Sequence, residues 1–290
     1  MRAKTRTKAA DLNFEGFASP HPHLPRPNPH HPQPRHLPRP AEAAYILALT
    51  FTTPDPKGLS TQFRLPLSLT PSYGREDFAV SSVNAEAVAR VDAWPAWPEG
   101  RLALVGPAGG GKTHLARAWA DAVGAVVVDA ADPAAAPLDL AALRGRPVLV
   151  EDADRRAQGG ALSDEALFHL LNMAGVDGGT VLLTGRVAPL AWDTAVPDLR
   201  SRLNALSVAV LDEPDDGVLE AVLRRAFAQR LLKPEPDLYP YLVARLPRSA
   251  AEAIAAADLL DEEAASRRRE LNKALAREVL EGFEGEDEAG

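Results

Sequence analysis

The chain has 290 residues, 46% of them hydrophobic and 25% charged, which is ordinary for a soluble globular protein of one large domain or two modest ones. It contains no cysteine, which excludes disulfides, thiolate metal ligands and cysteine nucleophiles. The net charge of −8 divides into +5 for residues 1–40 and therefore −13 for the remainder, and an acidic body disfavours direct binding of duplex DNA.

The first 58 residues are predicted to be a disordered arm. Residues 20–40 alone contain nine prolines and five histidines, and proline at this density disfavours both helix and sheet. The histidine spacing matches no defined metal site. The N-terminus lacks the apolar core of a secretory signal, and no run approaches the roughly 18 apolar residues that cross a bilayer. We therefore expect a cytoplasmic protein without membrane contact.

A compact run, TQFRLPL at 61–67, separates the arm from the first segment that is predicted to fold. It places a glutamine, spaced apolar residues and a proline within seven positions. Taken alone, the run is typical of an edge strand or a capping segment.

From about residue 100, strand and helix patterns alternate along the chain. Strands are predicted at 101–106, 125–130, 147–152, 180–185 and 206–211, with helices at 112–124 and about 163–174. This alternation predicts an α/β domain over 71–212, with a parallel sheet and helices on both faces.

After residue 212 no strand pattern recurs. Four helices are predicted there, at 215–232, 236–246, 249–265 and 267–282. We therefore expect a small all-α domain over 213–282, followed by an acidic tail at 283–290.

The run GPAGGGKT at 106–113 fits the phosphate-binding pattern G-x-x-x-x-G-K-[ST], and it lies between a predicted strand and a predicted helix. Backbone N–H groups of such a loop converge on phosphate oxygens. A glycine-rich turn without a ligand is the alternative, but it leaves the flanking strand and helix unexplained. The predicted ligand is ADP or ATP with Mg²⁺, held by Gly106, Gly109, Gly110, Gly111, Lys112 and Thr113.

The buried strand VLVED at 148–152 ends in two carboxylates, Glu151 and Asp152. In this class of fold we expect such a strand beside the P-loop, with its carboxylates facing the metal and the attacking water. Solvated turn residues are the alternative. The spacing from the P-loop favours a metal site formed by Thr113, Glu151 and Asp152.

Four motifs resemble the DnaA family of AAA+ ATPases in order and context. They are GKTHL (111–115), LFHLLN (167–172), VLLTG (181–185) and DLRSRL (198–203). The resemblance covers residues 62 to about 282 and implies an AAA+ fold with a helical lid. Within the family the chain is similar to the alphaproteobacterial Hda-type regulators. Only residues 130–146 separate the second and third predicted strands, where initiators of this family insert helices. The acidic tail at 283–290 stands where those initiators continue into a basic DNA-binding domain.

The resemblance implies roles for further residues. Arg202 matches the family's arginine finger, which stabilises charge on the γ-phosphate in a neighbouring subunit. A surface arginine paired with Asp198 is the alternative, and Arg200 is a weaker candidate for the finger. Thr184, in VLLTG, is expected to contact the nucleotide.

Two positions depart from the family pattern. Ala251 stands where the lid's sensor arginine is expected, so Arg248, about one helical turn earlier, is the candidate to contact the nucleotide instead. Glu151 and Asp152 replace an Asp followed by a catalytic acid, which should misplace both carboxylates. We therefore expect weak intrinsic ATPase activity at most.

The run QFRLPL resembles a clamp-binding peptide. The amide of Gln62 can hydrogen-bond at a pocket rim while Leu65 and Leu67 fill an apolar groove, and Pro66 lowers the cost of ordering. The predicted partners are DnaA and the β sliding clamp of DNA polymerase III, with DNA contacted only indirectly. Self-association stays open.

Three functions remain. The first is an adaptor, implied to be ADP-bound, that binds the clamp and stimulates hydrolysis of DnaA-bound ATP, and so represses replication initiation. The second is an autonomous ATPase, such as a helicase loader, and the third is a nucleotide-responsive binding module. The clamp-like peptide favours the first over the second, and only Arg202 separates the first from the third.

Overall fold

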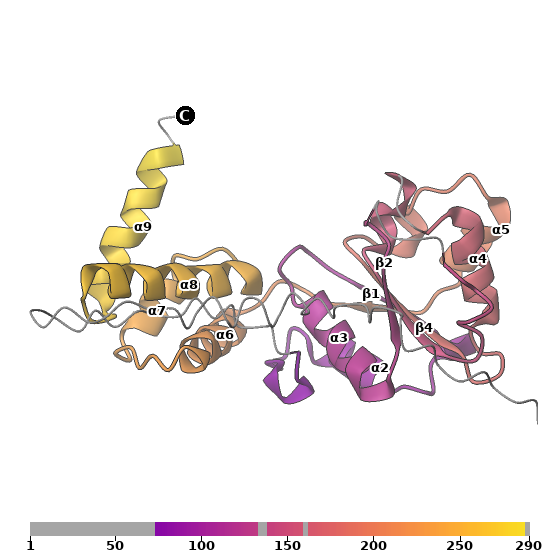
Figure 1. Ribbon diagram of the computed structural model, residues 1–290, viewed down its shortest axis with the longest axis horizontal. Helices are drawn as coiled ribbons and strands as arrows, with labels where there is room; N and C mark the ends of the chain where they lie inside the picture. Colours follow the sequence, from indigo (N-terminus) through magenta and orange to yellow (C-terminus); the bar gives the residue numbers. More distant parts are fainter. Residues whose placement is uncertain (1–72, 133–137, 159–161, 288–290) are drawn as a thin grey trace, which may run out of the picture. The chain divides into compact units, whose positions relative to one another are not determined.

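The computed structural model describes residues 73–132, 138–158 and 162–287, with side chains described as far as residue 281 (Figure 1). The predicted arm at 1–58 lies outside these residues. The predicted clamp-binding segment at 59–70, with Gln62, Leu65 and Leu67, also lies outside them.

A five-stranded parallel sheet forms the α/β part, with strand order β2-β3-β4-β1-β5. Its strands are β1 (Arg101–Val105), β2 (Val126–Asp129), β3 (Pro147–Glu151), β4 (Thr180–Gly185) and β5 (Val208–Val210). The side chains of β1 and β4 are buried throughout, as expected of parallel strands covered on both faces. The predicted α/β architecture is confirmed.

The acidic strand β3 does not pair with the P-loop strand β1, because β4 pairs with both and separates them. The carboxyl end of β4 therefore lies between the P-loop and the acidic residues.

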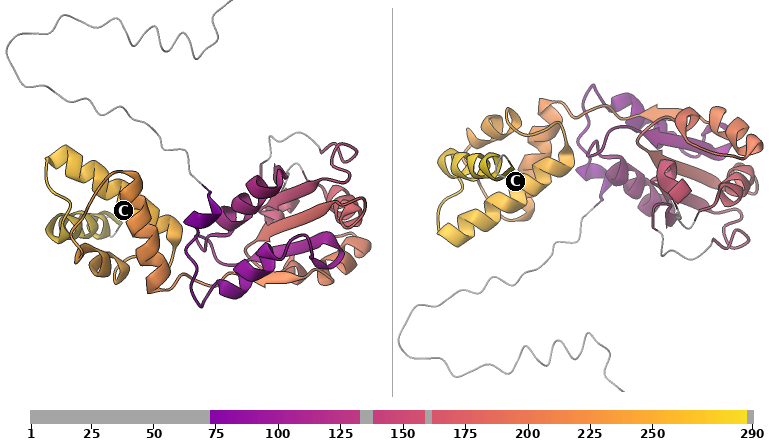
Figure 2. Two further views of the ribbon diagram at one scale, coloured as in Figure 1. Left: turned by 90° about the horizontal axis from the view of Figure 1, so that it is seen from below. Right: turned by 90° about the horizontal axis from the view of Figure 1, so that it is seen from above.

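Helices cover both faces of the sheet, as the views in Figures 1 and 2 show. Helices α2 (Ala85–Asp92) and α3 (Lys112–Val123) pack on one face, in a core that includes the adjacent rings of Trp97 and Trp119. Helices α4 (Asp164–Met173) and α5 (Pro197–Asn204) pack on the other.

Helix α2 was not predicted from the sequence. Helix α2 has only eight residues, and three of them, Ala87, Val88 and Val91, are buried. Residues 138–146, the described part of the β2–β3 connection, form turns rather than a helix.

Four helices follow the sheet, as predicted, and share a core of their own around Leu223, Phe227, Leu242 and Leu260. They are α6 (Asp216–Gln229), α7 (Leu238–Val243), α8 (Ala250–Arg267) and α9 (Lys273–Asp287). Side chains cap three of them: Asp215 accepts a hydrogen bond from the Val218 amide at 2.8 Å, Ser249 from the Glu252 amide at 3.2 Å, and Asn272 from the Leu275 amide at 3.0 Å. No helix in the described ranges is long and apolar enough to span a bilayer.

Candidate nucleotide-binding site

The P-loop joins the end of β1 to the start of α3, so its backbone N–H groups gather at a helix N-terminus. Gly106 packs so closely on the next strand's end that a Cβ here would lie 2.2 Å from the Leu211 carbonyl oxygen. Gly111 caps α3 with a φ of 94° and offers no side-chain cap. The first-turn amides of α3 are therefore available to an anion such as a phosphate.

Lys112 is buried within this loop and is 8% exposed. Its Nζ donates hydrogen bonds to the carbonyl oxygens of Gly106 at 2.8 Å and Pro107 at 2.7 Å. Burial lowers the pKa of Lys112, while the carboxylates of Asp152 and Asp154 oppose this shift. The ammonium is thus held at the loop, close to the acidic end of β3.

Glu151 ends β3 and forms an ion pair that the sequence analysis did not anticipate. Its Oε2 accepts a hydrogen bond at 2.7 Å from Nε of Arg117, and a second guanidinium nitrogen contacts the same oxygen. Its Oε1 is buried without a hydrogen-bond partner. Arg117 lies on α3, four residues after Thr113, and therefore on the same helix face.

Asp152 follows in a left-handed backbone conformation, with a φ of 51°. Its amide donates to Oγ1 of Thr184 at 3.0 Å, so the buried Thr184 of β4 fixes the turn after β3. Its carboxylate lies 3.4 Å from Arg155. Thr184 thus positions the acidic turn.

Mg²⁺ fits these residues poorly. Glu151 is already paired with a guanidinium, and Asp152 has Arg155 beside it. Within the part of the chain that the structure describes, no three acidic or histidine side chains form a cluster that could hold a metal. The exposed Thr113 hydroxyl is the remaining predicted ligand.

The start of α8 lies directly on the P-loop. The Ala250 amide donates to the Gly109 carbonyl oxygen at 2.8 Å. A Cβ at Gly109, whose φ is 70°, would lie 2.0 Å from Oγ of Ser249. This contact brings the lid to the phosphate-binding loop and requires glycine at position 109.

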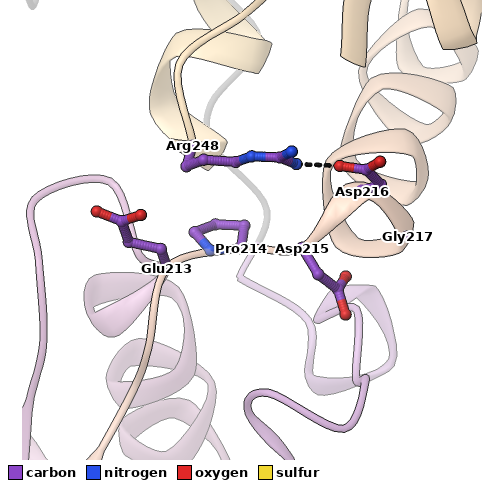
Figure 3. A pocket seen from close by; sticks show the side chains of 6 residues that line it. All are labelled: Glu213, Pro214, Asp215, Asp216, Gly217 and Arg248. Carbon is purple, nitrogen blue, oxygen red and sulfur yellow. Dashed lines mark hydrogen bonds and ion pairs between the residues drawn. The ribbon is translucent and has the colours of Figure 1, made fainter. Parts of the chain in front are cut away.

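Arg248 extends away from that contact and pairs with Asp216 at the start of α6 (Figure 3). The pair lines a pocket of about 480 Å³ formed by Glu213, Pro214, Asp215, Asp216, Gly217 and Arg248. The side chain of Asp215 points away from the pair. Arg248 therefore lies next to the site, with its guanidinium held by a carboxylate.

Arg202 lies at the opposite end of the sheet. Burial lowers the pKa of Arg101, the first residue of β1, and the positive charge of Arg202 lowers it further. Arg202 is exposed on α5, and its side chain forms no hydrogen bond or ion pair with another residue in the described ranges, so the alternative pairing with Asp198 is absent. Arg200, by contrast, donates to the Leu190 carbonyl oxygen at 3.0 Å.

The structure therefore brings Gly106, Gly109, Gly110, Gly111, Lys112, Thr113, Glu151, Asp152 and Thr184 to one end of the sheet, and leaves Arg202 outside this group. Sequence reasoning missed Arg117 and Asp154. Asp154 accepts a hydrogen bond from the Arg186 amide at 2.8 Å. Arg117 follows Thr113 by four residues, and this spacing indicates that both lie on the same face of the helix. The run E-D-A-D at 151–154 places Asp154 close to the two predicted carboxylates.

Comparison with known proteins finds similarity both in sequence and in structure. No family model matches the chain. The chromosomal replication initiator protein DnaA of Clavibacter sepedonicus is 26% identical, over 72% of this chain and 48% of that protein. The chain thus spans about half the length of this curated relative.

Solved structures share the fold at lower sequence identity. Domain III of the Thermotoga maritima replication initiation protein DnaA is 17% identical with a TM-score of 0.63, over 74% of this chain and 98% of that one. A replication initiator DnaA bound to AMPPCP and single-stranded DNA is 19% identical with a TM-score of 0.54, over 69% of each chain. The Thermotoga maritima RuvB Holliday junction branch migration motor is 17% identical with a TM-score of 0.56, over 72% of each. The chain is similar in sequence to DnaA and has the AAA+ P-loop fold.

Proposed function

We propose that this protein is a negative regulator of chromosomal replication initiation. In this proposal it binds an adenine nucleotide at the P-loop, binds the β sliding clamp through residues 62–67, and stimulates hydrolysis of ATP bound to DnaA. The sequence relation to DnaA and the AAA+ fold support a role in replication. A related DnaA has been solved with AMPPCP, which supports an adenine nucleotide as the ligand.

The position of Arg202 is the observation that carries the proposal. It lies near Arg101, where β1 begins, whereas the P-loop follows the end of β1. The five residues of β1 span roughly 16 Å at about 3.3 Å per residue. Arg202 is therefore out of reach of phosphates bound by its own P-loop. An exposed arginine without a partner in the described chain is suited to act on a nucleotide held by a neighbouring protein.

The chemistry follows from charge. During phosphoryl transfer, negative charge spreads over the γ-phosphate oxygens, and a guanidinium placed there stabilises the transition state. Arg202 supplies that group, and the bound DnaA supplies the ATP. Clamp binding raises the effective concentration of the protein near DnaA on DNA.

The acidic end of β3 argues against the autonomous motor. Glu151 is paired with Arg117, and Asp152 is fixed by Thr184 in a left-handed turn. The Asp152 carboxylate also lies beside Arg155, so both carboxylates have a cationic neighbour that disfavours their use as a general base. We propose that hydrolysis occurs in the partner.

The test is hydrolysis of radiolabelled ATP bound to purified DnaA, with and without this protein and with and without clamp loaded on DNA. The proposal predicts strong stimulation only when this protein and the loaded clamp are both present. Nucleotide-dependent binding to DnaA without faster hydrolysis would make the protein a binding module. Rapid ATP turnover by this protein alone would make it a motor.

A further inference from the structure

The ion pair between Arg117 and Glu151 places a permanent positive charge where P-loop proteins commonly bind a divalent cation. The Glu151 side chain is 10% exposed and the Arg117 side chain 34% exposed. A carboxylate this buried needs a counter-charge, because desolvation penalises an unpaired ion. Arg117 supplies that charge from the helix that also carries Lys112 and Thr113.

The other carboxylates at this end of the sheet also have protein partners, but Oδ1 of Asp154, like Oε1 of Glu151, is buried without a hydrogen-bond partner among the described residues. Asp152 lies beside Arg155, and Asp154 accepts a hydrogen bond from the Arg186 amide. The charges of Asp152, Asp154 and Arg186 all act on Lys112, so they surround the phosphate-binding loop. Arg117 of α3 and Arg155 of the turn after β3 thus supply counter-charges to Glu151 and Asp152, and a backbone amide supplies a hydrogen bond to Asp154.

We propose that Arg117 takes the place of the divalent cation at Glu151, so that this P-loop binds a nucleoside diphosphate with little dependence on Mg²⁺. The proposal rests on nucleotide binding at the P-loop, the first part of the proposed function. Arginine stays charged at all physiological pH values and forms a directional pair with a carboxylate. The Arg117 guanidinium contacts Oε2 of Glu151, and the buried Oε1 is the other oxygen of the same carboxylate. A divalent cation bound at Oε1 would therefore be repelled by the positive charge of Arg117.

The first measurement needs no variant. The dissociation constant for ADP is determined by calorimetry on the full chain, once with excess MgCl₂ and once with EDTA. The proposal predicts that the two values agree within about threefold, a small difference on the free-energy scale of binding. An ADP affinity that falls more than about tenfold in EDTA would overturn it.

The second measurement uses Arg117→Leu. This change leaves the buried Glu151 carboxylate without its partner and close to the phosphates, so ADP affinity in EDTA should fall at least about tenfold. Excess Mg²⁺ should restore most of it. Adding Glu151→Gln to Arg117→Leu removes the unpaired charge, and binding in EDTA should then return to within about threefold of wild type.

Arg144→Leu is the matched control, because it also breaks an arginine–carboxylate ion pair. Arg144 pairs with Asp177 at 2.9 Å, and this exposed pair is not part of the P-loop site. It should leave binding unchanged with and without Mg²⁺. If the wild-type chain binds neither ADP nor ATP under either condition, the nucleotide site itself is wrong. If it binds ADP only with Mg²⁺, the site stands and the role of Arg117 is wrong.

Discussion

The two ends of the sheet differ in whether the cationic residue that is proposed to act on a nucleotide has a partner within the chain. At the carboxyl end, Lys112 is hydrogen-bonded by its own loop, and Glu151 is paired with Arg117. At the amino end, Arg202 is exposed and has no hydrogen-bond or ion-pair partner among the residues that the structure describes. The neighbouring Arg200 is held by a backbone carbonyl.

We infer from this difference that the two ends of the sheet have different functions. Groups with internal partners are preorganised to hold a ligand at low cost in entropy. A charged side chain without a partner in the chain is available to another molecule. The carboxyl end is thus suited to retain a nucleotide, and the amino end to act on a partner.

The largest effect is expected at the amino end. Arg202→Ala should reduce stimulation of DnaA-bound ATP hydrolysis by on the order of 10³, the lower value for arginine fingers in GTPases. Clamp and ADP binding should not change, because the change affects only the partner's transition state. Lysine should not rescue, since a point charge does not reproduce the planar fork of guanidinium donors.

Arg200→Ala is the matched control for this experiment, because it removes the same charge two residues away. It should retain most of the stimulation, measured as single-turnover hydrolysis of labelled ATP. Full activity in Arg202→Ala together with loss in Arg200→Ala would assign the finger to Arg200.

At the carboxyl end, Lys112→Ala should weaken ADP and ATP binding by about a hundredfold or more. It removes a charge-assisted hydrogen-bond donor at the phosphates. Calorimetry measures the affinity, and Lys233→Ala, which alters an exposed lysine in a loop of the helical part, is the control. Undiminished binding in Lys112→Ala would refute the assignment of the site.

Replacing Gln62, Leu65 and Leu67 together by alanine should weaken clamp binding by about thirtyfold or more, since a few anchors carry most of the energy of such a contact. ADP affinity should not change. Retention on immobilised clamp and stimulation of DnaA at increasing protein concentration give the two readouts. Because tethering acts through effective concentration, high protein concentration should partly restore stimulation. Wild-type retention on the clamp would mean that the segment is not the binding peptide.

The smallest effect concerns Arg248. Asp216→Asn removes the partner that holds this guanidinium beside the pocket, and the freed side chain can then approach the γ-phosphate. ATP affinity should rise about threefold relative to ADP affinity, as expected for one partly exposed charge contact. Adding Arg248→Ala should abolish the gain. An equal change in both affinities would exclude a role of Arg248 as a sensor of the γ-phosphate.

Local sequence patterns predicted which helices and strands form better than they predicted which of these elements lie next to each other. The alternation of apolar runs predicted all five strands, and the glycine spacing placed the P-loop between β1 and α3. The position of β4 between β1 and β3 was not predicted, because periodicity does not say which strands pair. The contact of Arg117 with Glu151 joins residues 34 positions apart and depends on that packing.

The hydrogen bond from Ala250 to Gly109 has a mechanical consequence. It fixes the first turn of an 18-residue helix to the loop that is proposed to hold phosphate. Such a helix is about 27 Å long, so a tilt of about 5° at its start moves its far end by about 2 Å. Helix α8 thereby acts as a lever, and a small change in the P-loop becomes a larger displacement at the distal surface where α8 meets α9.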